Sequence, residues 1–423
     1  MKNKLYFLSS GLLISSILVG CGPGESSDGE SAAQKDSEGA TLVVWEDIDK
    51  SAGTEAAIAA FEEEHDVTVE VIERPYGDNV EDLRLDGPGG TGPDVFAMPH
   101  DSIGTAVTEG LIKPLDVSQE VQDMYTESAM LSQMVDGEVY GLPYAVETTL
   151  LYYNRYLVDE ENLPTTLDEW YEFSENITGD GTYGFLALWD QIYYAQSIIG
   201  GYGGYIFAQD DEGNYDVEDI GLNNEGAVEA AEYIQRFYSE GLFPSGIIGE
   251  QGINVLDSLF SEGKAAAVIS GPWNLGPYEQ AGIDYGVVPL PQLSNGDPMS
   301  SFVGVKSYNV SSYSEYPELA QELVLWLTNE ENQLTRYENT QEVPAIKALE
   351  DNPVITESDS TQAIFEQSGN SVLMPGIPEM SEVWTPADSA LQTIATGSAE
   401  PEEALNGATE AIRNQIEANH SGN

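Results

Sequence analysis

The order of apolar and polar residues near the start of the folded region predicts a strand, a helix and a second strand. Residues 41–45 are nearly all apolar, and residues 67–72 alternate and are rich in β-branched side chains, so both segments are predicted as strands. Residues 51–64 between them have helical spacing, with Ile58 and Phe61 as inward anchors. This βαβ pattern predicts an α/β domain.

The same patterns continue along the chain. They predict further strands at 94–97, 265–270, 286–290 and 301–305, and helices at 227–240, 318–328 and 402–417. The folded length exceeds what one core usually holds, so we expect two domains. No long linker divides the body, and two lobes would therefore share several chain crossings.

The N-terminal residues predict export. Residues 1–20 form a signal peptide with two lysines, a short apolar run and the small-residue site Leu18-Val19-Gly20 before Cys21. The run is too short and too broken by Ser and Gly for a good membrane span. The site resembles the bacterial lipobox, which implies lipid attachment at Cys21 and a place on the extracellular face of the cell membrane. The alternative is an ordinary signal peptide with an incidental cysteine.

A tether is predicted to follow the signal peptide. Residues 21–40 are mostly Gly, Ser, Asp, Glu and Gln, a composition that cannot bury a core and is typical of disorder. As a flexible coil the segment would span about 25 Å. Cys21 is the only cysteine, so no disulfide is expected in the folded part.

Charge narrows the function further. The chain has 14 Lys and Arg against 74 Asp and Glu, for a net charge of −60. Such a surface repels phosphate, which argues against nucleic acid as a partner. It favours a halophilic protein, the alternative being a merely acidic secreted one. Three scattered His make no metal site, no Ca²⁺ loop motif is present, and we expect no cofactor.

Seven segments, in family order, resemble the maltose/maltodextrin-binding proteins, which are the solute receptors of sugar ABC importers. They begin at Leu42, Gly92, Gly141, Gly200, Gly271 (Gly-Pro-Trp), Phe302 (Phe-Val-Gly-Val) and Met374 (Met-Pro-Gly-Ile-Pro-Glu-Met). The resemblance implies a two-lobe, type II periplasmic-binding-protein-like fold with a multi-strand hinge. The N-terminal lobe would comprise residues 41–146 and 304–350, and the C-terminal lobe residues 147–303 and 351–420. The function implied is non-catalytic capture of maltodextrin for an ABC permease and its ATPase.

A sugar offers flat C–H faces, which aromatic rings cover, and hydroxyl groups, which carboxylates and amides bind. By resemblance, the sugar-hydroxyl partners are Asp49, Lys50, Asp101 and Glu147, and the stacking platforms are Tyr193, Trp273 and Trp384. The chain departs from the best-known family pattern at Met98, Ser102, Gln191 and Thr385. Glucan length, and linear or cyclic form, therefore stay open.

Each candidate also has a structural interpretation. Trp45 lies in an apolar strand and Trp326 on an amphipathic helix, and both are expected in the core. For Trp170 and Trp189 the sequence does not decide between core and ligand contact. His100 is expected to be structural rather than a metal ligand. In so acidic a chain, the alternative for Asp49 and Asp101 is that they are solvated surface residues without a binding role. Three rival functions remain: binding of cyclodextrin or another oligosaccharide, a secreted glycoside hydrolase, and a structural surface lipoprotein.

Overall fold

The computed structural model describes residues 39–210 and 214–420, all within one compact unit. The predicted signal peptide, the lipidation site Cys21 and nearly all of the predicted tether lie outside the described residues. None of the described helices has the length and hydropathy of a membrane span.

The first sheet has six strands in the order β14-β13-β3-β1-β2, with β6 also paired to β13. β1 runs parallel to β2 and β3, and β13 runs antiparallel to β3 and β6. The strands are β1 (Thr41–Glu46), β2 (Thr68–Glu73), β3 (Val95–Pro99), β6 (Gly141–Thr148), β13 (Phe302–Val310) and β14 (Val372–Leu373). The strands predicted at 41–45, 67–72 and 94–97 are confirmed to within two residues.

The predicted strand at 301–305 covers only the first half of β13. The apolar pattern stops at Lys306, Ser307 and Asn309, and so the prediction ended there. All three are nonetheless buried, and each has hydrogen-bond partners in the fold, which is what allows polar residues inside a sheet.

The second sheet has four strands in the order β12-β7-β11-β8. β11 runs parallel to β8 and antiparallel to β7. The strands are β7 (Leu150–Asn154), β8 (Tyr183–Leu186), β11 (Ala265–Ser270) and β12 (Tyr285–Val288). The strand predicted at 265–270 is confirmed at both ends, and the one predicted at 286–290 starts one residue earlier and ends two residues earlier.

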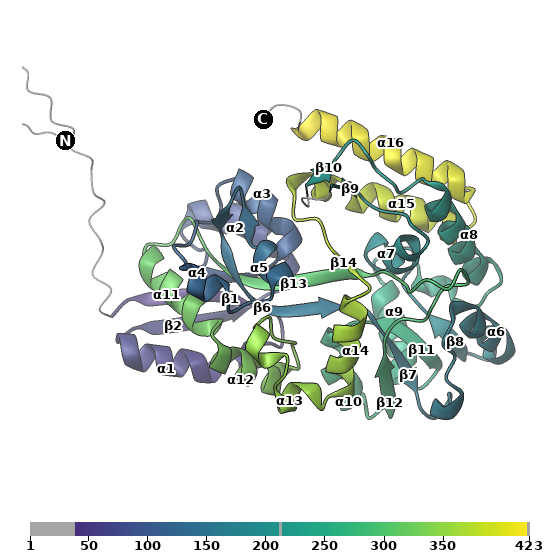
Figure 1. Cartoon of the computed structure of the whole chain (residues 1–423), viewed down its shortest axis with the longest axis horizontal. Helices are drawn as coiled ribbons and strands as arrows, with labels where there is room; N and C mark the ends of the chain where they lie inside the picture. Colours follow the sequence, from purple (N-terminus) through teal and green to yellow (C-terminus); the bar gives the residue numbers. More distant parts are fainter. Residues whose placement is uncertain (1–38, 211–213, 421–423) are drawn as a thin grey trace, which may run out of the picture. The chain divides into compact units, whose positions relative to one another are not determined.

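Helices cover both sheets (Figure 1). The longer ones are α1 (Glu55–His65), α2 (Asn79–Asp86), α6 (Leu167–Ile177), α7 (Ile192–Gly201), α8 (Glu225–Ser239), α9 (Gly252–Ser261), α10 (Leu275–Ala281), α11 (Pro317–Leu327), α12 (Glu330–Thr340), α14 (Asp359–Ser368), α15 (Trp384–Ala395) and α16 (Pro401–His420). The helices predicted at 227–240, 318–328 and 402–417 are confirmed as α8, α11 and α16. The helix predicted at 51–64 is split into a short 3-10 turn, η1 (Ser51–Gly53), and α1.

The chain passes between the two sheets several times. β6 and β7 are separated only by Thr149, which is buried, and β12 leads back to β13 in the first sheet. After β14, the chain returns to α15 and α16, which pack on α8. The fold is therefore two α/β lobes joined by several strands, as expected. The numbered lobe boundaries stay a prediction, and β14 pairs with the first sheet although it falls in the range assigned to the second lobe.

Candidate functional site

A cavity of about 280 Å³ opens where strands from both sheets end. Asp47 follows β1, Pro99 ends β3, and Trp273 follows β11, so the carboxyl ends of parallel strands supply part of its wall. Ligands of open α/β sheets bind at such strand ends. The remaining lining residues are Tyr76, Glu147, Tyr193, Tyr194, Ile253, Gly304, Val305, Lys306 and Met374.

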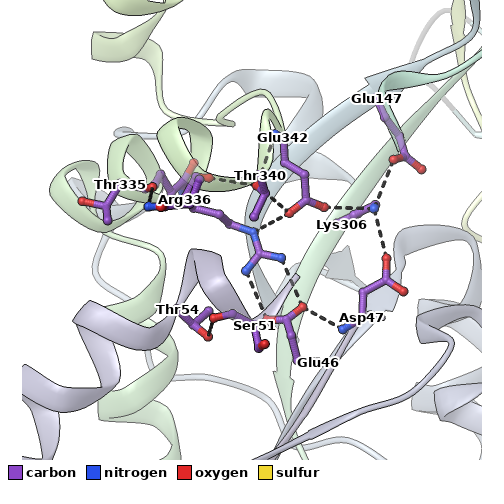
Figure 2. Close-up of polar contacts among 12 residues, drawn as sticks. Glu46, Asp47, Ser51, Thr54, Glu147, Lys306, Thr335, Arg336, Thr340 and Glu342 are labelled. Atoms are coloured by element: carbon purple, nitrogen blue, oxygen red, sulfur yellow. Dashed lines mark hydrogen bonds and ion pairs between the residues drawn. The ribbon is translucent and has the colours of Figure 1, made fainter. Parts of the chain in front are cut away.

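One side of this cavity carries the polar groups, and we call Asp47, Tyr76, Glu147 and Lys306 the charged wall. The Lys306 ammonium lies 3.3 Å from Glu147 Oε2 and 3.5 Å from Asp47 Oδ2 (Figure 2). The Tyr76 hydroxyl donates to Glu147 Oε1 at 3.1 Å, and Lys306 Nζ lies 4.6 Å from the centre of the Tyr76 ring. Acceptors and a donor thus stand side by side on one surface of the cavity.

A buried ion cluster of Glu46, Arg336 and Glu342 stands behind the charged wall. Lys306 Nζ also donates to Glu342 Oε1 at 3.0 Å, and Arg336 Nε donates to Glu342 Oε2 at 2.7 Å. Arg336 makes a second, two-point contact with Glu46, each bond 3.1 Å long (Figure 2). Bidentate pairs of this kind hold a guanidinium in one orientation, so the cluster anchors the wall from the protein interior.

Mutual attraction sets the ionisation of these groups. Burial alone would lower the pKa of Lys306, but Glu147 and Glu342 raise it well above its ordinary value. Burial opposes ionisation of Glu342, yet Arg336 and Lys306 bring its pKa down to about 2. Burial raises the pKa of Asp47, with Lys306 acting in the other direction. The surrounding carboxylates therefore favour the charged form of Lys306.

Aromatic rings lie at and beside the same cavity, and we call Trp273, Tyr193, Phe302 and Trp384 the aromatic row. Trp273 and Tyr193 line the cavity, whereas Phe302 and Trp384 lie outside its lining. Ring centres are 6.3 Å apart for Tyr193 and Trp273, 6.3 Å for Tyr193 and Phe302, and 6.4 Å for Phe302 and Trp384. Phe302 is buried, and the other three are partly exposed. Partly exposed aromatic rings are suited to the apolar faces of sugars.

The Gly-Pro-Trp sequence explains the position of Trp273. A Cβ on Gly271 would lie 2.1 Å from the Trp273 ring, so only glycine leaves room for the indole there. Pro272 starts a short 3-10 turn, η7 (Pro272–Asn274), and the Tyr152 hydroxyl donates to the Gly271 carbonyl at 2.8 Å. These local constraints fix the ring at the end of β11.

The structure brings some predicted site residues together and places others elsewhere. Glu147, Tyr193 and Trp273 line the cavity, and Trp384 belongs to the aromatic row outside its lining. Asp49 is exposed with a left-handed φ of 60°, and Lys50 is partly exposed; neither lines the cavity.

Asp101 also lies outside the cavity lining. One of its carboxylate oxygens is buried without a hydrogen-bond partner among the described residues, and burial raises its pKa to about 6. The pKa of the nearby Tyr76 is raised well above its ordinary value by burial and by Glu147, and Asp101 adds to this effect.

Sequence reasoning did not select Asp47, Tyr76 or Lys306. Two of them carried a usable signal. Asp47 comes directly after a buried strand, and Lys306 interrupts the apolar strand 302–310, where a lysine must have buried partners. Tyr76 lies in a short turn and is one of the 23 tyrosines of the chain. No pattern in the sequence distinguishes it from the others.

His100 joins segments far apart in the chain. Its Nδ1 accepts from the Val305 amide at 3.0 Å, and its Nε2 donates to the Met374 carbonyl at 2.8 Å. Burial lowers its pKa to about 4. This is the structural role that was predicted, and the described residues contain no group of side chains able to hold a metal.

The remaining four tryptophans lie in the core or pack against it. Trp45 is buried as predicted, and Trp326, partly exposed, packs edge-on against Phe61 and donates to the Ala57 carbonyl. Trp170 and Trp189, left open from the sequence, are both fully buried. None of the four lines the cavity.

A larger cavity, about 530 Å³, lies between α7, the β9–β10 hairpin (Ala208–Gln209 and Tyr215–Asp216) and β14. Phe302 contributes to its wall, but no Asp, Glu, Lys or Arg does. The larger cavity offers the amides of Gln196 and Gln209 but no charged group, whereas the smaller one combines carboxylates with an ammonium. Charged groups make the stronger hydrogen bonds to hydroxyls, so the smaller cavity with the charged wall is the better candidate site.

Known proteins resemble this chain in sequence and in fold. The model of the bacterial extracellular solute-binding protein family matches residues 56–363. The chain is 59% identical to a galactooligosaccharide-binding protein of Bacillus subtilis (strain 168), over 100% of this chain and 99% of the relative. It is 36% identical to a maltodextrin-binding protein of the same organism, over 84% and 85%. The crystal structure of a maltose-binding periplasmic protein of Listeria monocytogenes in complex with maltose is similar, with 35% identity, a TM-score of 0.77, and coverage of 90% of this chain and 99% of that one.

Proposed function

Because the chain belongs to the bacterial extracellular solute-binding protein family, we propose that it captures an oligosaccharide between its lobes and delivers it to an ABC importer. The family and the relatives are binding proteins rather than enzymes, so the glycoside hydrolase alternative is dropped. The observation that carries the proposal is that the charged wall and two rings of the aromatic row, Tyr193 and Trp273, line one cavity. The first suits hydroxyl groups and the second suits ring faces.

The ligand we propose first is a galactooligosaccharide. Its support is the 59% identity, over essentially the whole chain, to a relative named for that ligand. Maltodextrin, predicted from the sequence, is the second candidate, supported by the relative named for it and by the similar structure that holds maltose. Galactose and glucose differ in the orientation of one hydroxyl group, and the two oligosaccharides differ also in the linkage between their units. The hydroxyl partners and the shape of the site together decide between them.

Isothermal titration calorimetry distinguishes these ligands. The mature protein is titrated with β-1,4-galactotriose, maltotriose, a cyclodextrin and sucrose in buffers of high salt. We expect binding of galactotriose, weaker or no binding of maltotriose, and no heat from sucrose. Tighter binding of maltotriose would make maltodextrin the ligand, and no binding of any of these oligosaccharides would contradict the proposal.

We propose further that the receptor is anchored by lipid at Cys21. The support is the lipobox-like sequence at the only cysteine, together with two relatives from Streptococcus pneumoniae that are named as lipoproteins. Replacing Cys21→Ser should move the protein from the membrane fraction to the medium. Unchanged membrane retention and processing would contradict the anchor.

A further inference from the structure

Lys306 occupies an unusual position in the site. It lies on β13, one of the strands that link the lobes, where the pairing with β6 shifts register between Lys306 and Ser307. Only 3% of the residue is exposed, yet it forms part of the cavity lining. A buried lysine is costly unless its charge is compensated, so its surroundings define its role.

Three carboxylates from three separate segments surround its ammonium group. Asp47 follows β1, Glu147 lies on β6, and Glu342 follows α12. With Glu46 and Arg336, the connected groups comprise four carboxylates and two cations, an excess of two negative charges. A receptor that needed only structural cohesion here would not require more anions than cations.

The two cations have different tasks. Arg336 pairs with Glu46 and Glu342, which do not line the cavity. Among the ion pairs of residues 39–210 and 214–420, Lys306 is the one cation that contacts Asp47 and Glu147, the two carboxylates of the charged wall. Glu147 also accepts from the Tyr76 hydroxyl and Asp47 from the Tyr76 amide, but Lys306 is the cation that the two carboxylates share.

We propose that Lys306 determines which sugar the receptor accepts, by holding Asp47 and Glu147 apart as two acceptors with its own ammonium as the donor between them. The inference rests on the proposed function. A sugar hydroxyl both donates and accepts, so a neighbouring pair of hydroxyls in the right configuration satisfies carboxylate and ammonium together. An epimer leaves one of these buried groups unpaired, and sites built on hydrogen bonds reject such analogues strongly.

Stacking against Trp273 and Tyr193 depends on the apolar face of a sugar ring, whereas the carboxylates and the ammonium contact its hydroxyl groups directly. Lys306→Met should therefore change selectivity and not only affinity. We expect the Kd for the better-bound of β-1,4-galactotriose and maltotriose to rise about thirtyfold or more, in the range of buried binding anchors. The ratio of the two Kd values should move toward one by about tenfold.

Lys264→Met is the matched control. It removes the same charge at a half-exposed position, where the ammonium pairs with Glu262 and does not line the cavity. We expect the Kd ratio of the two sugars to stay within about twofold of wild type. An equal change of the ratio in both variants would mean that loss of a positive charge, rather than the contacts of Lys306, alters selectivity, and would overturn the inference.

Lys306→Arg guards against misfolding of the methionine variant. It keeps the charge but replaces a compact ammonium by a planar fork, so the ratio should change while the melting temperature stays near wild type. If wild type binds a sugar and the folded Lys306 variants keep its Kd ratio, this inference fails and the proposed function stands. If wild type binds none of the oligosaccharides in the calorimetry panel, both fail.

Discussion

The two sides of the cavity are built on opposite principles. The charged wall comes from the lobe of the first sheet and is held by ion pairs from the interior, whereas the aromatic row comes largely from α7, η7 and α15 and makes no ion pair in the described structure. Ion pairs are directional and costly to disturb in a buried place, while stacking is permissive. We therefore expect selectivity and part of the stability to depend on the charged wall, and affinity on the aromatic row.

The largest effect is expected from Arg336→Met. The change leaves Glu46 and Glu342 buried without their guanidinium partner, and breaking such a pair commonly costs 3–5 kcal/mol, so about 4 kcal/mol of unfolding free energy should be lost. Urea unfolding followed by tryptophan fluorescence measures it. The control is Arg84→Met, whose pair with Glu109 is largely exposed and should cost less than about 1 kcal/mol. Equal losses in both variants would show that the buried cluster has no special role.

His100, where β13 meets the segment after β14, should make stability depend on pH. The unfolded chain takes up a proton on this side chain near pH 6.5, but the folded chain does so only near pH 4. Between these values the unfolded state binds more protons, so stability falls as the pH drops through this window, by about 2 to 3 kcal/mol. Asp101, with its pKa raised to about 6, acts in the opposite direction.

His100→Gln isolates this contribution, because glutamine does not titrate and can still donate to the Met374 carbonyl. Asp101 is the same in both proteins. The difference in unfolding free energy between pH 7 and pH 4.5, measured by urea titration, should shrink by that amount in the variant. An unchanged difference would mean that His100 is not held neutral by the fold.

On the aromatic side, Trp273→Ala should reduce sugar affinity about thirtyfold or more, since truncating a buried aromatic anchor commonly costs ~2 kcal/mol or more. Trp384→Ala should have a smaller effect, because Trp384 touches the row only through Phe302 and lies outside the cavity lining. Calorimetry of the folded variants with galactotriose measures both.

Trp45→Phe, a change in the core, is the control. It should lower stability and leave the affinity near wild type. Wild-type affinity in both alanine variants would contradict a role of the aromatic row in binding.

The smallest effect concerns the whole surface. A net charge of −60 repels itself strongly when the Debye length is about 30 Å, at 0.01 M salt, and weakly at about 3 Å, at 1 M. The melting temperature should therefore rise with NaCl, while sugar stacking, which is not ionic, should persist. Calorimetry or fluorescence measures the melting temperature at each salt concentration. A melting temperature that stays constant or falls up to molar NaCl would contradict the halophilic interpretation.

Much of the fold was accessible from the sequence. Continuous apolar runs located β1 and β11, alternation located β2, and helical spacing located α8. The prediction did not include β6 and β7, in which Pro143, Glu147 and Asn154 interrupt the apolar residues. The family resemblance selected Glu147, Tyr193 and Trp273, which line the cavity.

The sequence by itself, through its patterns and its family resemblance, thus determined the two-lobe α/β plan, the acidic charge and three rings of the aromatic row, Tyr193, Trp273 and Trp384. Only the tertiary structure showed that Asp47, Glu147 and Glu342 converge on Lys306, because those carboxylates lie 259, 159 and 36 positions from it along the chain. Nothing local in a sequence encodes which distant carboxylates will share one buried ammonium. That convergence depends on strand pairing between β13, β3 and β6, and on the packing of α12 against η1.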